Sequence, residues 1–409
     1  MRIGIDCRTI LNSKSSERAG VAHYSYYLLK HILEIDKNNE YILFLSHGQT
    51  LPKELFARNV KVVNFSKKIF PFIHSHYGVA QEIKNQHVDI YHSLSGILPL
   101  FFKGKSIITV ADLSMYVNPQ WFSPKKIFGD FFWRKILIPK SIKKANRIIA
   151  VSENTKKDIL RFFPIQEKKI LVIHNGLERE NISDNKVKEV LEKFNLIGKK
   201  YFLFIGTVEP RKNIINIIKA FEEFLYTPHP SARGGHPLPQ GEREKSEGEI
   251  NKEEYFFVIA GGLGWKYEPM LDAIKNSTVN SQIKYIGYIS AEEKISLLKN
   301  TLCFVWPSLY EGFGLPILEA MACGAPVITS NTSSIPEVAG NASIMIDPND
   351  AQALSEAMAR VAHNENEQKK LRLLGIERVN FPRTKVWEVF FHQNGRAYEI
   401  LQIFLNIYF

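Results

Sequence analysis

Two glutamates, Glu311 and Glu319, stand with seven residues between them in a stretch that changes character twice along its length. The apolar run Leu302 to Trp306 predicts a buried strand. The glycines that follow let a backbone approach a ligand closely, and Pro316 suits the first turn of a helix. Strand, glycine turn and helix together direct backbone N–H groups at a phosphate. A carboxylate repels such an anion, so we expect the glutamates to bind something else, with sugar hydroxyls the best candidates. The alternative is an ordinary βα unit with two solvated glutamates.

A second pattern with chemical potential is the basic pair Arg211 and Lys212. It follows the predicted strand Tyr201–Gly206 and precedes the predicted helix Ile214–Leu225. A cation at a helix N-terminus favours anions twice, through its own charge and through the helix dipole. The pattern therefore predicts an anion site.

Near the N-terminus, a strand predicted at Arg2–Asp6 leads through a polar loop to Gly20 and a helix from Val21 to about Ile35. A loop and a glycine before a helix form one arrangement that holds a phosphate or a sugar. Asp112 follows another predicted strand, Ser106–Val110. An aspartate at that position is either a helix cap or a catalytic residue, and the residues alone leave both alternatives open.

Predicted strands and predicted helices alternate along the chain and position these groups. Short β-prone runs are separated by helical patterns, which indicates parallel α/β sheets with ligand sites at the carboxyl ends of the strands. A chain of 409 residues is too long for one ordinary core and suggests two domains. We expect an N-terminal domain at 1–178 and a C-terminal domain at 179–387, with a final helix at about 388–409 packing back on the first. Residues 228–249 are rich in Pro and Gly, and we expect a disordered insertion there.

The string EGFGLPILEAMACGAPVI resembles the E-x7-E signature of retaining, GT-B-type glycosyltransferases of family 4. The match continues through SIPEVAG downstream, GTVEPRKN in the second domain, and MRIGIDCRTI with AGVAHYSYYLL at the start. The resemblance covers nearly the whole chain. It implies the GT-B architecture, two doubly wound Rossmann-like domains facing a cleft.

The resemblance also assigns roles to individual residues. Glu311 would contact the donor sugar and act in catalysis, whereas Glu319 would bind the ribose hydroxyls. The remaining positions inherit contacts with the donor's sugar, diphosphate or base: Gly20, Val21, Arg211, Lys212, Gly262, Ile286, Phe313, Gly314 and Leu315. Asp112 is the second catalytic candidate. The family usually has a histidine before that aspartate, but this chain has Ala111.

The implied activity is transfer of a hexose, mannose favoured, from a nucleotide-diphosphate sugar with retention of configuration. The acceptor would be a saccharide or a lipid-linked saccharide, in polysaccharide or glycolipid biosynthesis. No Asp-x-Asp stands on a strand-end loop, so we expect no metal and no cofactor besides the GDP- or UDP-sugar substrate. Front-face transfer needs no strong protein base, which makes Ala111 tolerable.

Three other functions fit some of these observations. A sugar-nucleotide epimerase of the same fold would turn over the donor without an acceptor. A catalytically impaired sugar-nucleotide-binding protein is suggested by Ala111 and the insertion. The net charge of +11 suggests nucleic acid. However, the basic residues coincide with sugar-nucleotide motifs and no nucleic-acid module is visible, so we do not expect nucleic acid as a partner.

Cysteine content, charge and hydropathy bear on where in the cell the protein resides. Three cysteines in apolar settings, no signal peptide and no stretch of about 18 apolar residues predict a cytoplasmic protein. The basic, aromatic stretch Trp121–Arg147 either lies on the inner face of an anionic membrane or packs its apolar stripe on the sheet. We favour packing, with solvated lysines. Peripheral membrane contact remains the alternative.

Overall fold

A computed structural model describes residues 1–8, 20–65, 74–122, 133–177, 181–226 and 254–380. The predicted insertion at 228–249 and the predicted C-terminal helix at about 388–409 lie outside these ranges. The described residues form two compact units. Of the described residues, 1–8, 20–65, 74–119 and 133–177 belong to the first unit, and 120–122, 181–226 and 254–380 belong to the second.

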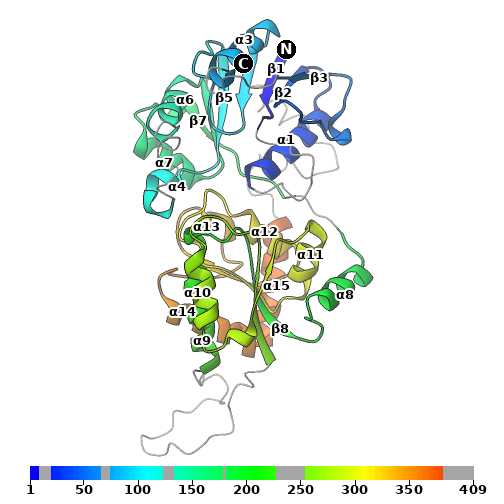
Figure 1. The fold of residues 1–409 in the computed structure, drawn as a ribbon, viewed down its shortest axis with the longest axis vertical. Helices are drawn as coiled ribbons and strands as arrows, with labels where there is room; N and C mark the ends of the chain where they lie inside the picture. The colour runs from blue at the N-terminus through cyan, green and yellow to red at the C-terminus, as the bar shows by residue number, and fades with distance from the viewer. Residues whose placement is uncertain (9–19, 66–73, 123–132, 178–180, 227–253, 381–409) are drawn as a thin grey trace, which may run out of the picture. The chain divides into compact units, whose positions relative to one another are not determined.

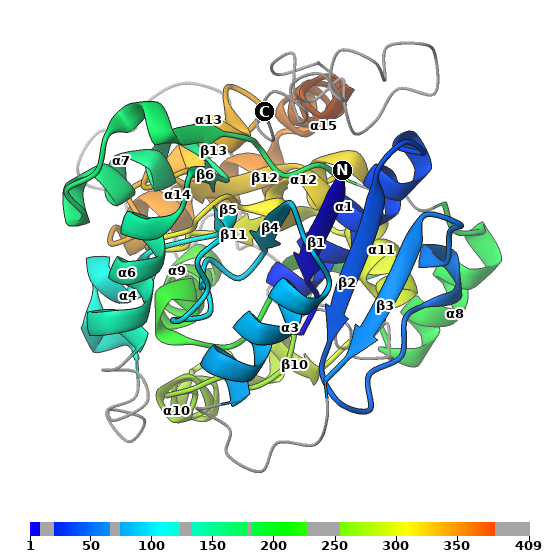
Figure 2. The same cartoon turned by 90° about the horizontal axis from the view of Figure 1, so that it is seen from above.

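The first unit is built on a parallel sheet with the strand order β3-β2-β1-β4-β5-β6-β7, and Figure 2 labels the strands from β3 to β6. The strands are β1 (Arg2–Asp6), β2 (Glu40–Leu45), β3 (Val60–Asn64), β4 (Ile90–Ser93), β5 (Lys105–Val110), β6 (Arg147–Ala150) and β7 (Ile170–Val172). Its α-helices are α1 (Val21–Ile35), α3 (Val79–Asn85), α4 (Ser114–Val117), α6 (Ile138–Lys144) and α7 (Glu153–Phe162).

Alternating side chains divide the core of this unit into two layers. Leu43 of β2 packs with Leu29 of α1, whereas its neighbour Phe44 packs with the residues of α3, α6 and α7. A sheet that buries apolar side chains on both faces needs helices on both faces. The strand order reverses at β1, so this unit is doubly wound, as predicted.

Only the end of the predicted stripe in the basic, aromatic stretch is described, so the packing of the stripe on the sheet stays a prediction. Leu137 and Ile142 are buried, and Ile142 belongs to the same apolar cluster as the sheet. Lys140, Lys143 and Lys144 are exposed. The rest of the predicted stripe, including Phe128, Phe131 and Phe132, lies outside the described residues.

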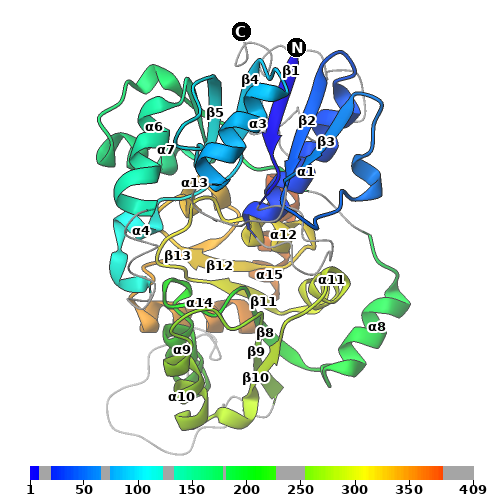
Figure 3. The same ribbon diagram turned by 45° about the horizontal axis from the view of Figure 1, so that its top comes forward.

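The second unit has the parallel strand order β10-β9-β8-β11-β12-β13, which can be followed in Figure 3. The strands are β8 (Lys200–Ile205), β9 (Tyr255–Ala260), β10 (Ile283–Gly287), β11 (Cys303–Trp306), β12 (Val327–Ser330) and β13 (Ile344–Ile346). The α-helices are α8 (Asp184–Lys193), α9 (Ile214–Tyr226), α10 (Glu268–Asn276), α11 (Ala291–Asn300), α12 (Leu315–Ala322), α13 (Ile335–Ala339), α14 (Ala351–His363) and α15 (Glu365–Asn380).

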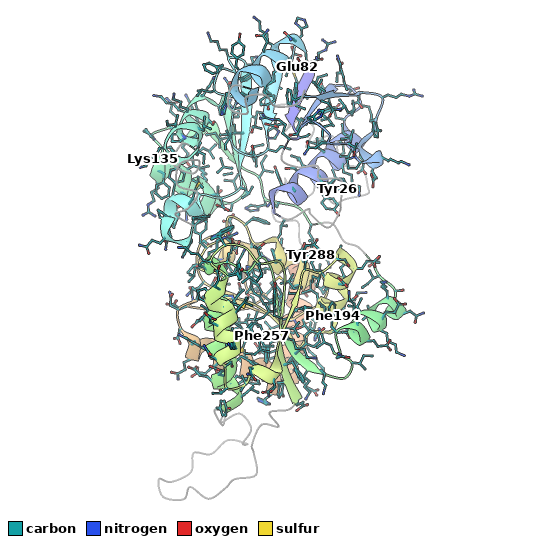
Figure 4. The ribbon with its side chains drawn as sticks, in the orientation of Figure 1. Tyr26, Glu82, Lys135, Phe194, Phe257 and Tyr288 are labelled. Carbon is teal, nitrogen blue, oxygen red and sulfur yellow. The ribbon has the colours of Figure 1, made fainter. Side chains whose placement is uncertain are left out.

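Helices cover both faces of the second sheet as well. Figure 1 shows α9, α10 and α14 grouped on one side of the strands, and α8, α11, α12 and α15 on the other. Aromatic rings fill the space under α9: Phe221 lies 5.9 Å from Phe257, which Figure 4 labels inside this unit. Both units therefore carry the predicted doubly wound topology.

Helix α15 is an element that the sequence analysis did not anticipate. It places Gly375 against α12, where an added Cβ would stand 3.2 Å from the Cγ of Met321. Arg378 donates hydrogen bonds to the carbonyl oxygens of Val338 (3.0 Å) and Glu337 (2.7 Å) at the end of α13. The helix therefore braces α12, which carries the predicted site residues Leu315 and Glu319, and α13 of the downstream SIPEVAG block.

Candidate active site

The turn between β11 and α12 has the predicted form of strand, glycine turn and helix. Gly314 immediately precedes the helix with φ 111° and ψ 43°, a conformation that a side chain disfavours. Pro316 stands in the first helical turn, where its missing N–H is not needed. A helix leaves its first N–H groups without partners inside the helix, so the turn offers donors to an anion.

Two serines of the SIPEVAG region fix the shape of this turn. The N–H of Glu311 donates to Ser333 Oγ at 3.0 Å. The buried hydroxyl of Ser334 donates to the carbonyl oxygens of Glu311 (2.9 Å) and Phe313 (2.8 Å). The downstream block therefore supports the glycine turn directly.

Glu311 is the centre of a buried charge network. The residue is 7% exposed. Its carboxylate accepts hydrogen bonds from Lys212 Nζ at 2.5 Å, Arg211 Nη1 at 3.0 Å and Ser308 Oγ at 2.6 Å. Burial by itself would raise the pKa of this carboxyl, but the two cations and the hydroxyl lower it to about 2. Glu311 is therefore ionised at neutral pH.

The basic pair that meets Glu311 is held by a tight loop. Pro210–Lys212 form a single 3₁₀ turn, and Asn213 follows in the left-handed region with φ 60°, which asparagine tolerates. The Asn213 amide donates to the carbonyl oxygens of Pro307 (3.3 Å) and Pro348 (2.5 Å). These contacts join the loop after β8 to the loops after β11 and β13.

A second carboxylate, Glu209, completes the network. It is 4% exposed and pairs with Arg211 Nε at 2.5 Å. Two cations and two carboxylates thus balance one another in a nearly solvent-free cluster. Lys212 is also buried, with Nζ 4.4 Å from the centre of the Trp306 ring, and burial lowers its pKa against the opposing effect of Glu311.

Glu319 has a different environment. It lies on α12 with its side chain 15% exposed, and it pairs with Lys294 Nζ of α11 at 2.7 Å. The structure therefore gives the two glutamates of the motif separate cationic partners. The ribose contact of Glu319 stays a prediction.

The predicted base-binding positions lie at the carboxyl ends of neighbouring strands. Gly261 has φ 138°, and an added Cβ would stand 1.9 Å from the carbonyl oxygen of Gly206, so only glycine fits. Its N–H donates to the oxygen of Gly287 at 2.7 Å. This bond joins the loop that contains Gly262 to the strand that contains Ile286 at one edge of the sheet. Their contact with a base stays a prediction.

In the first unit, Gly20 immediately precedes α1 with φ 54°, and its carbonyl oxygen accepts from the N–H of Tyr24 at 3.1 Å. Val21 begins that helix as predicted. Asp112 is exposed and accepts from the N–H (2.9 Å) and the hydroxyl (2.6 Å) of Ser114. Such a bond from residue i+2 caps a turn. The catalytic role of Asp112 stays a prediction.

His92 at the end of β4 belongs to the core. It is fully buried, and its Nε2 lies 2.9 Å from Thr109 Oγ1. Burial lowers its pKa to about 3, so the imidazole is neutral. His92 is a structural histidine in this arrangement.

Sequence reasoning missed four members of the site: Glu209, Ser308, Ser333 and Ser334. Glu209 directly precedes Pro210 and the basic pair, and a carboxylate within three residues of two cations in a loop is a usable signal. The serines gave a weaker signal, because the hydroxyl partners are set by loops that meet only in the folded chain.

Comparison with known families covers most of the chain. Residues 187–377 match the family model described as Glycosyl transferases group 1, and residues 18–181 match Glycosyltransferase Family 4. The chain is 29% identical over 314 residues to the O-antigen chain mannosyltransferase B of Escherichia coli, covering 76% of this chain and 74% of that protein. It is 26% identical over 272 residues to the serotype-specific mannosyltransferase WbdA of Escherichia coli, covering 66% of this chain but 30% of that protein.

Solved structures resemble the whole fold at low identity. WaaG, a glycosyltransferase involved in lipopolysaccharide biosynthesis, superposes with a TM-score of 0.68 at 12% identity, covering 95% of this chain and 97% of that one. HepE of Anabaena, in complex with UDP and glucose, gives 0.67 at 13% identity, covering 98% and 100%. Within the described residues, no helix has both the length and the apolar character required to cross a membrane.

Proposed function

Because the chain belongs to family 4 of the GT-B glycosyltransferases, within the glycosyl transferases of group 1, we propose that it transfers mannose from a nucleotide-diphosphate sugar. The acceptor is a saccharide or a lipid-linked saccharide, and the product belongs to polysaccharide or glycolipid biosynthesis. The relatives named as O-antigen mannosyltransferases support this choice of sugar and pathway class. Transfer proceeds with retention of configuration.

The observation that carries the proposal is the ionised, buried Glu311 beside Arg211 and Lys212 at the glycine turn. A donor diphosphate meets Arg211 first, because Arg211 keeps 17% of its side chain exposed against 7% for Lys212. The helix N-terminus after Gly314 adds N–H donors for the departing phosphate. Both features stabilise the charge that develops on the leaving group.

Glu311 supplies the complementary negative charge. Positive charge develops on the sugar as the glycosidic bond lengthens, and a fixed carboxylate is worth more at that moment than in the ground state. The leaving phosphate oxygen takes the proton of the acceptor on the same face. No protein base is required in this scheme, which accommodates Ala111.

The donor is a GDP- or UDP-sugar, with GDP-mannose favoured, and the enzyme uses no further cofactor or metal in this proposal. A thermal-shift comparison of GDP, UDP and their mannose and glucose derivatives tests the nucleotide. A ligand at 100 times its dissociation constant stabilises by roughly 2.7 kcal/mol. We expect the largest shift with GDP-mannose.

Transfer itself is tested with GDP-mannose and a panel of saccharide acceptors, reading the anomeric configuration of the product by NMR. We expect an α-linked product from the α-linked donor, and a β-linked product would refute retention. Release of an epimerised sugar nucleotide without any acceptor would instead support the epimerase. Donor binding without turnover on any acceptor would support an impaired binding protein.

A further inference from the structure

The indole ring of Trp306, at the end of β11, lies in a stack of aromatic rings. Its centre is 5.0 Å from that of Phe204 on β8 and 5.6 Å from that of Phe304, and the ring planes lie within 18° of parallel. Trp306 is 1% exposed, and both phenylalanines are fully buried. The hydroxyl of Thr329 donates to the carbonyl oxygen of Trp306 at 2.8 Å. The neighbouring strands therefore fix both the backbone and the ring of Trp306.

The ring contacts both ends of the loop that follows β8. An added Cβ at Gly206 would stand 2.8 Å from Trp306 Cη2, so the indole lies directly against the backbone where the loop begins. Lys212 Nζ, near the other end of the loop, lies 4.4 Å from the ring centre. The position of the Trp306 ring therefore bears on the whole loop that carries the basic pair.

The ammonium group of Lys212 has three N–H donors, and the protein occupies only part of this capacity. Among the described residues, it makes one hydrogen bond, to Glu311 Oε1 at 2.5 Å. The electron-rich face of Trp306 attracts the same positive charge, and this attraction is stronger in a buried site than at an exposed one. Glu311 and Trp306 thus hold the ammonium group together and leave N–H capacity for a ligand.

A buried lysine needs such partners to stay protonated. Burial lowers the pKa of Lys212, Glu311 raises it, and Arg211 lowers it again. Glu209 is the further charged group that acts on it, and it raises the pKa. The π face of Trp306 replaces part of the hydration that the ammonium group loses on burial.

Packing alone does not account for tryptophan at this position. The indole N–H is buried, and no residue in the described part of the chain accepts a hydrogen bond from it. A buried donor without a partner costs free energy that a phenylalanine ring would avoid. Tryptophan offers a cation the strongest π face among the aromatic side chains, so the contact with Lys212 supplies a reason for the indole.

We propose that Trp306 is a positioning residue for donor binding, whose π face holds the ammonium group of Lys212 where a phosphate of the donor can accept from it. This inference rests on the proposed function and adds to it a residue that does not touch the donor. Trp306 is too deeply buried for direct contact with a ligand. It acts through Lys212.

The test replaces Trp306 alone, in the full chain, with tryptophan that carries one, two or three ring fluorines. Fluorine withdraws electron density and almost preserves the shape of the ring, so the attraction for a cation weakens in steps while packing is kept. Isothermal titration uses GDP-mannose or, if the wild type binds it more tightly, UDP-glucose. We expect the dissociation constant to rise with each fluorine, about fivefold in total. An unchanged dissociation constant across the series would overturn the proposal.

The same fluorinated series in a Lys212→Met background shows whether the ring acts through the lysine. Contacting residues are energetically coupled, so an effect that passes through Lys212 should vanish when the lysine is absent. We expect the fluorinated and unfluorinated Lys212→Met proteins to bind the nucleotide sugar within about twofold of each other. A loss equal to that in the wild-type background would overturn the proposal, because the ring would then act without Lys212.

Phe221→Leu is the matched control for core packing. Phe221 is fully buried on α9 of the same unit, and its ring centre lies 6.2 Å from that of Phe202. We expect Phe221→Leu and Trp306→Leu both to lower the thermal unfolding temperature, but only Trp306→Leu to weaken binding of the nucleotide sugar. Equal losses of affinity in the two variants would reduce Trp306 to a packing residue and overturn the proposal.

Failure of this inference is distinguishable from failure of the proposed function. If Lys212→Met weakens binding of the nucleotide sugar and fluorination of Trp306 does not, the donor site stands and the role of Trp306 is wrong. If the wild type binds neither GDP-mannose nor UDP-glucose, the proposed function fails and this inference fails with it.

Discussion

Glu311 and Asp112 both follow the end of a parallel strand, one in each unit, and their surroundings differ. Glu311 is 7% exposed and receives hydrogen bonds from Lys212, Arg211 and Ser308. Asp112 is exposed, and the bonds that it accepts within the described residues come from Ser114 two residues later. Position at a strand end is thus shared, whereas burial and partners are not.

This difference in burial and partners separates a carboxylate that requires a functional explanation from one that does not. Burying a carboxylate costs several kcal/mol before its partners compensate, and apolar residues of similar volume are often as stable. Two buried carboxylates, a buried lysine and the half-buried Arg211 beside a glycine turn are therefore better explained by function than by stability. A capped turn such as that of Asp112 needs no such explanation.

The largest expected effect is that of Glu311→Gln. The variant keeps size and hydrogen bonding but removes the charge opposite the reacting sugar, so we expect kcat to fall on the order of a hundredfold or more. Steady-state kinetics with saturating donor measures it. Glu367→Gln is the matched control, because Glu367 is ion-paired with Arg360 at 2.6 Å in the same unit. Wild-type kcat in Glu311→Gln would remove that residue from catalysis.

The pH dependence of stability in the wild type and in Glu311→Gln tests the ion pairs of Glu311. The pKa of Glu311 is lowered to about 2 from an ordinary value near 4.5, so its ionised form contributes stability fully above pH 4.5 and loses it as pH falls towards 2. The difference in free energy of unfolding between wild type and Glu311→Gln should therefore shrink across that window. A constant difference between pH 5 and 2 would contradict the assigned ion pairs.

Lys212→Met should give the next largest effect. It keeps the stem over Trp306 and removes a charge-assisted contact worth roughly 1.5–3 kcal/mol, so we expect donor affinity to fall tenfold or more. Isothermal titration with the nucleotide sugar measures it. Unchanged affinity and rate would exclude Lys212 from the donor site.

Glu209→Gln sharpens the comparison within the network. Glu209 orients Arg211 and does not reach the reacting atoms in our proposal, so we expect donor KM to rise severalfold with kcat less affected. Glu209→Asp should recover part of the loss because the charge is kept. A hundredfold loss of kcat with unchanged KM would place Glu209 among the reacting groups instead.

Glu319→Gln should raise the donor KM by about fivefold with little change in kcat, since a ribose contact is shared by ground and transition states. Lys294 is left without its partner in this variant. The double variant Glu319→Gln, Lys294→Gln separates that effect from donor binding. If only thermal stability changes, Glu319 serves the α11–α12 contact alone.

The two sheets could be predicted from the sequence because strand and helix periods repeat cleanly. Helix α1 begins and ends at the predicted residues, Val21–Ile35. The strand predicted at Tyr201–Gly206 spans Lys200–Ile205 as β8, because sequence defines the ends of a short strand poorly. Helix α15 escaped prediction because its sequence is polar, with only Leu371 and Gly375 buried.

The site was only partly predictable for a different reason. Motif spacing singled out Glu311 and the basic pair, and the fold joins them across about a hundred residues of sequence. Glu319 pairs with Lys294, which lies on a separate helix, and no local sequence pattern predicts this ion pair. Tertiary packing determines which loops contact one another. Amino-acid composition and hydrophobic periodicity do not predict such contacts.

The smallest effect should be that of Asp112→Asn, which removes the charge and keeps an oxygen that can accept from the N–H of Ser114. If Asp112 only caps its turn, kcat and KM should stay within about twofold of wild type. Asp112→Ala removes the cap as well and should lower thermal stability by about 1 kcal/mol without a matching loss of activity in the folded protein. A loss of kcat in Asp112→Asn comparable to that of Glu311→Gln would break the comparison. It would show that an exposed carboxylate with one local partner meets the substrate after all, and that burial is a poor guide to catalysis in the first unit.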